Sequence, residues 1–251
     1  MSHSAHVHVG GHGDTSTATN KFELLAAILL GVAGIFTALA SFQAGLWNGK
    51  MSEHYGDANK IATAAAADKS QAIVEMSKDA AVDIQAKQVI VEGGDERARA
   101  GRALIAAYLY VSQMSEAGFK AMGFSDELKK TFKKEQDQNA PLSKDELALL
   151  DDMTKKSMNT DLTGNKAYQT EMLEKSKERS DEADKTFKEG VEAKENADRF
   201  ELGDVIFAVS LFFTGISLVF RTRIRWAIIA VGGVFLLCGV IYMLTIPWTF
   251  S

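Results

Sequence analysis

Four histidines lie close together at the start of the chain, in the stretch MSHSAHVHVGGHGD: His3, His6, His8 and His12. Imidazoles at this spacing on a flexible segment can bind Zn, Cu or Ni, and a histidine at position three can also form a copper site with a free amino terminus. If the initial Met is trimmed, His3 becomes the second residue and this copper site cannot form. The surrounding Gly, Ser and Thr favour another interpretation, a solvated polar tail whose metal binding is weak and adventitious.

Two acidic residues are the other candidates for chemistry, because Glu23 and Asp204 each lie at the edge of an apolar stretch. Carboxylates embedded in a membrane line ion paths or form rings in oligomeric pores. Both acids lie within one helical turn of a polar region, where hydration is cheap, so we favour the simpler interpretation of hydrated interface residues. A face of small and hydroxyl residues accompanies Asp204 and suits helix–helix contact: Gly203, Ser210, Thr214 and Ser217.

Catalytic signatures are absent from the sequence. It contains no nucleophile elbow, no phosphate-binding glycine loop, no cysteine pair and no His-Glu metal helix. The single cysteine, Cys238, lies in an apolar stretch, so no disulfide framework is possible. We therefore expect neither enzyme activity nor a bound cofactor.

Three apolar stretches determine where these residues are placed. Residues 24–42, 205–220 and 226–246 carry no charge, although the whole chain of 251 residues has a net charge of −5. A helix of about 19 residues at ~1.5 Å each spans roughly 28 Å, close to the thickness of a bilayer core. We predict three membrane-spanning helices.

The tryptophans support this prediction independently. Trp47, Trp226 and Trp248 are the only ones in the chain, and each lies at the end of a predicted span, as interfacial residues do. Ala38-Leu39-Ala40 has the form of a signal-peptide cleavage site. The helical pattern runs on past Gly45, however, so we favour a retained anchor.

A short basic loop separates the second and third spans. Its arginines, Arg221, Arg223 and Arg225, predict that this loop faces the cytoplasm, because Lys and Arg in short loops stay inside. The N-terminus would then be cytoplasmic and the charged region extracytoplasmic. The loop acts as a topological anchor, and attraction to anionic lipid follows from its charge.

The charged region between the first two spans predicts helices only. Residues 58–91 contain no Gly or Pro, and Gly93-Gly94 ends this helix. A second helix is predicted over residues 95–122. Four apolar residues of the first helix recur at steps of seven and four, as a single apolar face requires: Ile73, Ala80, Ile84 and Val91.

Two serines mark further helix starts. Ser125 begins one, and Ser143 begins another in a capping box with Glu146. A last helix runs from about Asn165 into the second span, and its thin apolar stripe suits an antiparallel hairpin or coiled coil. The members of that stripe are Tyr168, Met172, Ala183, Phe187, Val191 and Phe200.

The predicted fold is all-α, an integral membrane protein with three transmembrane helices and an elongated helical or coiled-coil domain outside the membrane. Its parts in order are a tail (1–21), the first span (22–47), the helical domain (48–201), the second span (202–220), the basic loop (221–225), the third span (226–248) and a short tail (249–251).

Small residues form a regular series in the first span. They recur at steps of four, three, four, three and four, which places them on one seam of a left-handed helix pair. Small residues let membrane helices approach closely, so we expect this seam to be an interface with another copy or with a span of the same chain. The seam consists of Ala27, Gly31, Gly34, Ala38, Ser41 and Gly45.

Two sequences carry a family resemblance: LLGVAGIFTALASFQAGLWNGK with the Ala-rich helix after it, and FELGDVIFAVSLFFTGISLVFRTRIRWAIIAVGGVFLLCGVIYM. Their layout resembles a family of bacterial inner-membrane proteins known as domain of unknown function 4337. The resemblance covers residues 22–67 and 195–243, whereas residues 93–164 depart from it. It implies one N-terminal span, a charged helical middle and a C-terminal hairpin, but no activity.

These features together predict a membrane-anchored structural or interaction protein that associates with itself or with another membrane protein. The lipid bilayer is its surroundings, and nucleic acid is not an expected partner. Two alternatives stay open at this point: an oligomeric pore or transport accessory subunit, and metal handling through the histidine tail.

Overall fold

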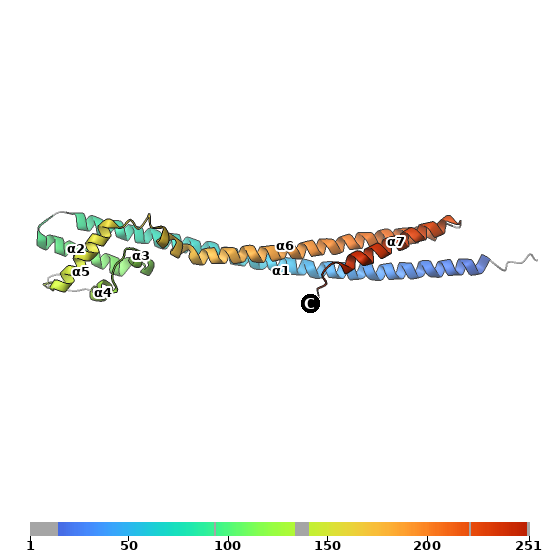
Figure 1. Cartoon of the computed structure of the whole chain (residues 1–251), viewed down its shortest axis with the longest axis horizontal. Coiled ribbons are helices and arrows are strands. Elements are labelled where there is room, and N and C mark those ends of the chain that lie inside the picture. Colours follow the sequence, from blue (N-terminus) through green and yellow to red (C-terminus); the bar gives the residue numbers. More distant parts are fainter. Residues whose placement is uncertain (1–14, 93, 134–140, 221, 250–251) are drawn as a thin grey trace, which may run out of the picture. The chain divides into compact units, whose positions relative to one another are not determined.

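The structure, a computed structural model, describes residues 15–92, 94–133, 141–220 and 222–249, with only the backbone described for residues 15–20. No strand occurs in these ranges. The helices, shown in Figure 1, are α1 (Thr15–Val91), α2 (Glu96–Gln113), α3 (Glu116–Ala121), α4 (Asp126–Thr131), α5 (Lys144–Asn159), α6 (Lys166–Ser217) and α7 (Ile224–Leu244).

Three of these helices are long and apolar enough to cross a membrane: α1, α6 and α7. This confirms the all-α fold with three candidate spans. Both α1 and α6 continue from their apolar part into charged sequence as single helices, as the sequence predicts. Gly190 and Gly203 lie inside α6 without ending it, because packing stabilises a long helix more than one glycine weakens it.

The chain divides into two compact units. We call Met1–Asp57 with Lys185–Ser251 the membrane-spanning unit, and Ala58–Asp184 the polar unit. The division falls inside α1 and α6, about ten to twenty residues away from the domain limits predicted at residues 48 and 201. Each unit has its own core and is described by itself.

Alanines at steps of seven define the buried face of α1 in the membrane-spanning unit. Ala26, Ala33 and Ala40 are almost completely buried. Their small side chains let neighbouring helices approach, and large residues fill the remaining space. Ala33 and Ala40 share a core with Phe200 and Phe207 of α6 and Leu236 and Met243 of α7, whereas Ala26 packs with Phe22 and Ile229.

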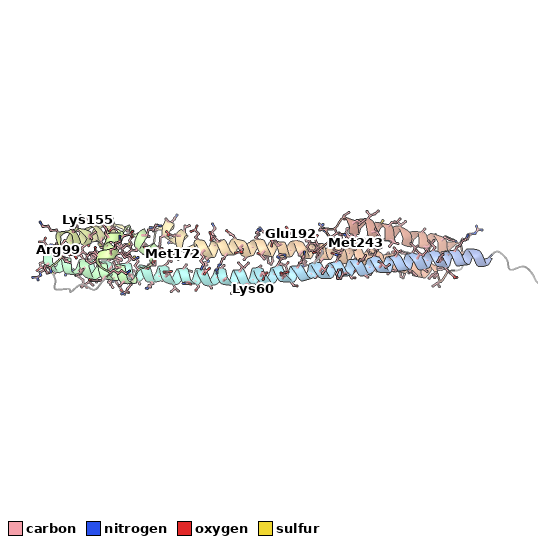
Figure 2. The ribbon with its side chains drawn as sticks, turned by 90° about the horizontal axis from the view of Figure 1, so that it is seen from below. Lys60, Arg99, Lys155, Met172, Glu192 and Met243 are labelled. Carbon is pink, nitrogen blue, oxygen red and sulfur yellow. The ribbon has the colours of Figure 1, made fainter. Side chains whose placement is uncertain are left out.

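The polar unit has an aromatic core. Phe124 lies between Tyr110 and Phe119, with ring centroids 4.8 and 5.2 Å apart, and Phe132, Leu128 and Leu150 are fully buried near them. The predicted starts at Ser125 and Ser143 are confirmed, including the capping box between Ser143 and Glu146. Away from this core, the side chains of Arg99 and Lys155 project outward (Figure 2).

The helix predicted over residues 95–122 is interrupted. It ends at Gln113, and α3 begins at Glu116. The backbone N–H of Ser115 donates to the carboxylate of Asp79 over 2.7 Å instead of continuing the helix, and the Ser115 hydroxyl caps α3 at Gly118. This tertiary hydrogen bond therefore divides the single helix that the sequence predicts into two helices.

The apolar face of α1 predicted in the polar unit is turned outward. Ile73, Ile84 and Val91 are 47%, 55% and 64% exposed, and Ala80 is half-buried. The face that packs inward carries Ala72, Asp79, Val82, Asp83 and Ala86. Phe187 of the predicted α6 stripe is exposed as well, with its ring stacked on Tyr55 at 5.0 Å.

Candidate functional site

The small-residue seam of α1 is open to the outside. All six of its residues are exposed, from Ala27 to Gly45. At Gly31, Gly34 and Gly45, no atom lies within 4 Å of the position that a Cβ would take. The chain leaves this face of the first span uncovered along most of its length.

A different face of α1 makes the contacts inside the chain. Ala33 and Ala40 pack with α6 and α7, and the ring of Phe36 stacks on Phe207 with centroids 5.6 Å apart. Helices α6 and α7 pack on this face of α1 and not on the seam. For most of the seam, the structure therefore does not show the contact with a span of the same chain that the sequence left open.

Ser41 is the exception. Its hydroxyl donates to the Asp204 carboxylate of α6 over 2.5 Å, while the second oxygen of Asp204 is buried without a partner. The structure thus ties one of the two predicted acids to the seam itself. Glu23, the other acid, is exposed.

Two glycines of α7 bring it close to α6. A Cβ at Gly232 would lie 2.6 Å from the Thr214 hydroxyl oxygen and 3.1 Å from the Ser210 carbonyl oxygen, and a Cβ at Gly239 would lie 2.6 Å from the ring of Phe207. The Ser210 hydroxyl donates across the two helices to the Gly232 carbonyl over 2.7 Å. These two glycines allow α7 to pack closely against α6.

The hydroxyl face of α6 is consequently occupied within one chain. Gly203, Ser210, Thr214 and Ser217 are all buried. Ser217 donates back to the Thr214 carbonyl of its own helix. Among the described residues, only the Ser210 hydroxyl bonds across to α7, and the buried Thr214 hydroxyl has no hydrogen-bond partner. This face is therefore packed inside the single chain and does not line an open path.

Aromatic and basic residues meet where α7 begins. The rings of Phe22 and Trp226 pack edge to face at 5.1 Å, and the Arg225 guanidinium lies 4.3 Å from the centre of the Phe22 ring, a cation–π contact. Arg223 occupies the N-cap position of α7. The third predicted anchor, Arg221, lies outside the described residues.

The other end of the spans is closed by a C-terminal clasp. The buried Gln43 side chain donates to the Thr249 carbonyl and accepts from the Thr249 backbone N–H, both over 3.1 Å. Trp47 donates to the Pro247 carbonyl over 3.2 Å. The sequence places Trp47 at a membrane interface but does not reveal that its indole N–H and Gln43 hold the C-terminal segment.

The predicted metal ligands His3, His6, His8 and His12 lie outside the described residues. Among the residues that are described, no group of three or more His, Cys, Asp or Glu side chains is arranged to hold a metal ion. The fifth histidine, His54, has its Nδ1 3.5 Å from the Glu189 carboxylate.

The polar unit contains a buried polar network that sequence reasoning missed. Asp79 is fully buried and accepts hydrogen bonds from the backbone and hydroxyl of Ser115 and from the Tyr168 phenol over 2.6 Å. Gly118 leaves the room for this carboxylate, because a Cβ there would overlap it. Asp79 thereby joins α1, α3 and α6.

One turn further along α1, Asp83 makes a second junction. It accepts from the Tyr110 phenol over 2.8 Å and pairs with Lys87 over 2.7 Å. Tyr110 also lies 2.7 Å from the Ser157 hydroxyl, and Lys87 donates to the Thr160 carbonyl over 2.8 Å. Asp83 therefore joins α1 to α2 and α5.

Burial keeps the phenols of this network neutral. It raises the pKa of Tyr110 and of Tyr168 far above the ordinary value of 10.0, and the hydrogen bonds to Asp83 and Asp79 raise both further. Each carboxylate is surrounded by donors of the chain itself, so the arrangement suits structural stabilisation better than catalysis. The signal available in the sequence is Asp79, Asp83 and Lys87 at steps of four in an Ala-rich helix.

Comparison with known proteins adds one finding. Residues 128–246 match a family described as a domain of unknown function, DUF4337. The match supports membership of this family through these residues, which make up slightly less than half of the chain. No curated protein and no solved structure matches the chain.

The DUF4337 match begins inside α4 and ends just beyond α7. It therefore includes residues 128–164. These residues belong to the range 93–164, which we expected from the sequence to depart from the family, so that expectation is wrong for this part. The match also contains Tyr168, the hydroxyl face of α6 and both contact glycines of α7, whereas the seam of α1 lies outside it.

Proposed function

We propose that this DUF4337 protein is a non-enzymatic membrane protein that assembles with further copies of itself through the seam of α1. The supporting observation is that all six seam residues are exposed in a chain whose own helices already pack on another face of α1. A second helix fits closely against residues without bulky side chains, and such van der Waals packing drives association between spans in lipid.

We further propose a location in the bacterial plasma membrane, with the N-terminus cytoplasmic and the polar unit extracytoplasmic. Arg223 and Arg225 support this orientation, because basic residues in short loops stay on the cytoplasmic side. The contact of Arg225 with Phe22 supports placing the beginning of the first span at the same membrane surface as the loop.

The seam is tested by adding bulk to it. Gly31→Leu combined with Gly34→Leu leaves the fold of the single chain intact, because both sites are open, but it separates the copies. We expect self-association to weaken by at least about tenfold, which corresponds to ~1.4 kcal/mol. Native mass measurement and cross-linking in mild detergent report the oligomer.

A matched control adds bulk elsewhere on the same helix. Ile28 and Ile35 are 53% and 62% exposed and lie off the seam, so Ile28→Phe with Ile35→Phe should leave the oligomer unchanged. A wild-type chain that is monomeric, or an equal effect of the two pairs, would contradict the proposal.

Orientation is tested with one accessible cysteine. Lys155→Cys in a Cys238→Ser background places a thiol where the side chain is 69% exposed in the polar unit. We expect a membrane-impermeant maleimide to label it in cells with a permeabilised outer membrane. Labelling that occurs only after lysis of the inner membrane would show that the polar unit faces the cytoplasm and would contradict the proposed orientation.

Asp204 supports a second candidate function, a pore or transport accessory subunit. Its carboxylate contacts seam residue Ser41 and keeps one buried oxygen without a partner, so an assembly through the seam brings several such carboxylates together. Ion flux into liposomes that falls on Asp204→Asn would favour this candidate, and the absence of flux would leave the structural role.

A further inference from the structure

The exposed face of α1 in the polar unit is unusual for a helix rich in charge. Its large apolar residues Ile73, Ile84 and Val91 are about half or more exposed, and they line up with Ser77, Ala80 and Gln88. We call these six residues the outer face. Contiguous exposed apolar surface marks an interaction site more often than a solvated one.

The outer face has the spacing of a two-helix contact. Ile73 and Ala80, Ser77 and Ile84, and Ile84 and Val91 are each seven residues apart. The six residues recur at steps of four, three, four, four and three. Alternating steps of four and three keep one face turned toward a partner helix along a left-handed supercoil, and the second consecutive step of four, from Ile84 to Gln88, unwinds that supercoil locally. The partner indicated by this repeat is a helix.

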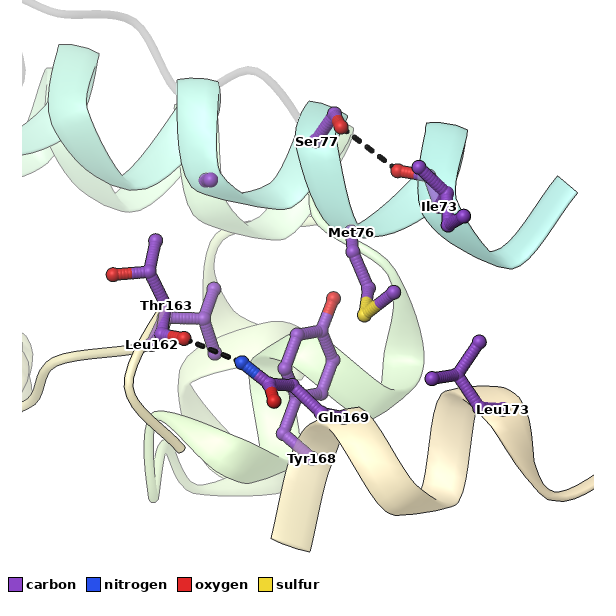
Figure 3. Close-up of a pocket in the computed structure, with 9 residues that line it drawn as sticks. Ile73, Met76, Ser77, Leu162, Thr163, Tyr168, Gln169 and Leu173 are labelled. Atoms are coloured by element: carbon purple, nitrogen blue, oxygen red, sulfur yellow. Dashed lines mark hydrogen bonds between the residues drawn. The ribbon is translucent and has the colours of Figure 1, made fainter. Parts of the chain in front are cut away.

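Hollows along the outer face can receive apolar side chains. One, of about 330 Å³, lies between α1 and the beginning of α6, where Figure 3 shows Met76 and Leu173 around the ring of Tyr168. The polar groups at its rim are engaged: Ser77 donates to the Ile73 carbonyl, and Gln169 donates to the Thr163 carbonyl. The hollow therefore offers apolar surface to its occupant.

The charge of the outer face indicates which helix this is. None of its six residues is charged, and the neighbouring Lys87 is engaged with Asp83 and the Thr160 carbonyl. All copies of a membrane protein are inserted in one orientation, so the α1 helices of two neighbours run parallel. A symmetric parallel pair places each residue opposite itself, which like charges would oppose and uncharged residues allow.

We propose that the outer face of α1 pairs in parallel and in register with the outer face of a second copy of this chain. This inference rests on the proposed self-association and adds an interface to it outside the membrane. Ile73, Ile84 and Val91 supply the apolar contact. Ser77 and Gln88 at the same contact favour one register, as polar residues do in helix pairs.

Complementary charges at one position provide the test. Ile84→Lys and Ile84→Glu each place like charges opposite one another in a pair of identical chains, whereas a mixed pair has opposite charges there. We expect each variant alone to lose cross-linked dimer by at least about tenfold, and co-expression of the two with different tags to restore it in mixed pairs. Restoration requires residue 84 to face residue 84.

Cysteine pairs measure the same contact directly. In a Cys238→Ser background, Ser77→Cys and Ile84→Cys should form disulfide-linked dimers in membranes under a mild oxidant, at least about fivefold more than Glu75→Cys on the opposite side of α1. Equal yields at the three positions, or preferred pairing of Ile73→Cys with Val91→Cys in an antiparallel arrangement, would overturn the inference.

The two proposals fail in distinguishable ways. Dimers in mild detergent that respond to Gly31→Leu with Gly34→Leu, but show no pairing at residues 77 and 84, overturn only the outer-face contact. Monomers in the wild-type chain overturn both. Cross-linking of Ile84→Cys to a different protein overturns the identity of the partner.

Discussion

The two units of this protein bury the same helix by different means. In the membrane-spanning unit, α1 packs through alanines, and α7 approaches α6 so closely that Gly232 has no space for a Cβ. In the polar unit, α1 buries two carboxylates, Asp79 and Asp83, one turn apart. One unit is held mainly by shape and the other by shape together with charge-assisted hydrogen bonds.

The surroundings of each unit explain the difference. Between spans, burying apolar surface gains nothing over lipid, so close van der Waals contact and single hydroxyl bonds such as Ser210 to Gly232 provide the stability. A carboxylate there is expensive. In the polar unit, helices assemble from water, and a buried carboxylate is tolerated where donors from several helices replace its hydration, as at Asp79.

The strongest way to break this comparison is to remove Asp79. Asp79→Ala leaves the Ser115 and Tyr168 donors buried without an acceptor, and we expect the polar unit to lose ~3 kcal/mol or more of unfolding free energy. Thermal and denaturant unfolding followed by circular dichroism measures this. Asp151→Ala, which removes an exposed ion pair with Lys155, should cost less than about 0.5 kcal/mol. Similar losses would show that the network is not what holds this unit.

Close packing in the membrane-spanning unit is tested by two adjacent glycines. Gly232→Ala forces α6 and α7 apart and should cost about 1–3 kcal/mol. Gly233→Ala is the matched control, because no atom lies within 4 Å of its Cβ position. Thermal stability in mild detergent distinguishes the two, and an equal loss would contradict a contact held by shape.

Alkaline pH should weaken the polar unit selectively. The folded-state pKa of Tyr110 and Tyr168 is raised above the ordinary 10.0, so the folded state holds these protons while the unfolded state releases them above about pH 10. Their contribution is complete below that pH and is lost above it, by up to ~1.4 kcal/mol per pH unit for each phenol. Tyr110→Phe with Tyr168→Phe should make the melting temperature depend less on pH between pH 9 and about pH 11 than it does in the wild type. An unchanged pH dependence would show that these two phenols are not its origin.

The smallest expected effect concerns the C-terminal clasp. Gln43→Ala removes two hydrogen bonds to the Thr249 backbone and should cost ~1 kcal/mol. In a Cys238→Ser chain carrying Thr249→Cys, maleimide labelling should then become severalfold faster. Asn48→Ala, which removes a longer contact of 3.4 Å with Glu201, should leave the rate unchanged. No acceleration in either variant would show that the segment is held elsewhere.

The sequence by itself determines the features that depend on local chemistry. Uncharged stretches predict the three spans, and serines with a suitably placed acid predict helix starts, as at Ser143 with Glu146. Strong helix formers also predict that α1 and α6 run unbroken out of their apolar parts. These features follow from hydropathy and from hydrogen bonds between residues a few positions apart, so no tertiary information is needed.

Tertiary structure alone decides which side of a helix is buried. The spacing of Ile73, Ile84 and Val91 places them correctly on one face of α1, yet that face is exposed and the face with Asp79 is inside. The same holds for the seam, whose exposure depends on where α6 and α7 pack. Asp79 is buried because Ser115 and Tyr168, 36 and 89 residues away, bring their donors to it. A periodic pattern shows which residues share a face, but only the arrival of remote partners determines whether that face meets water, lipid or the core.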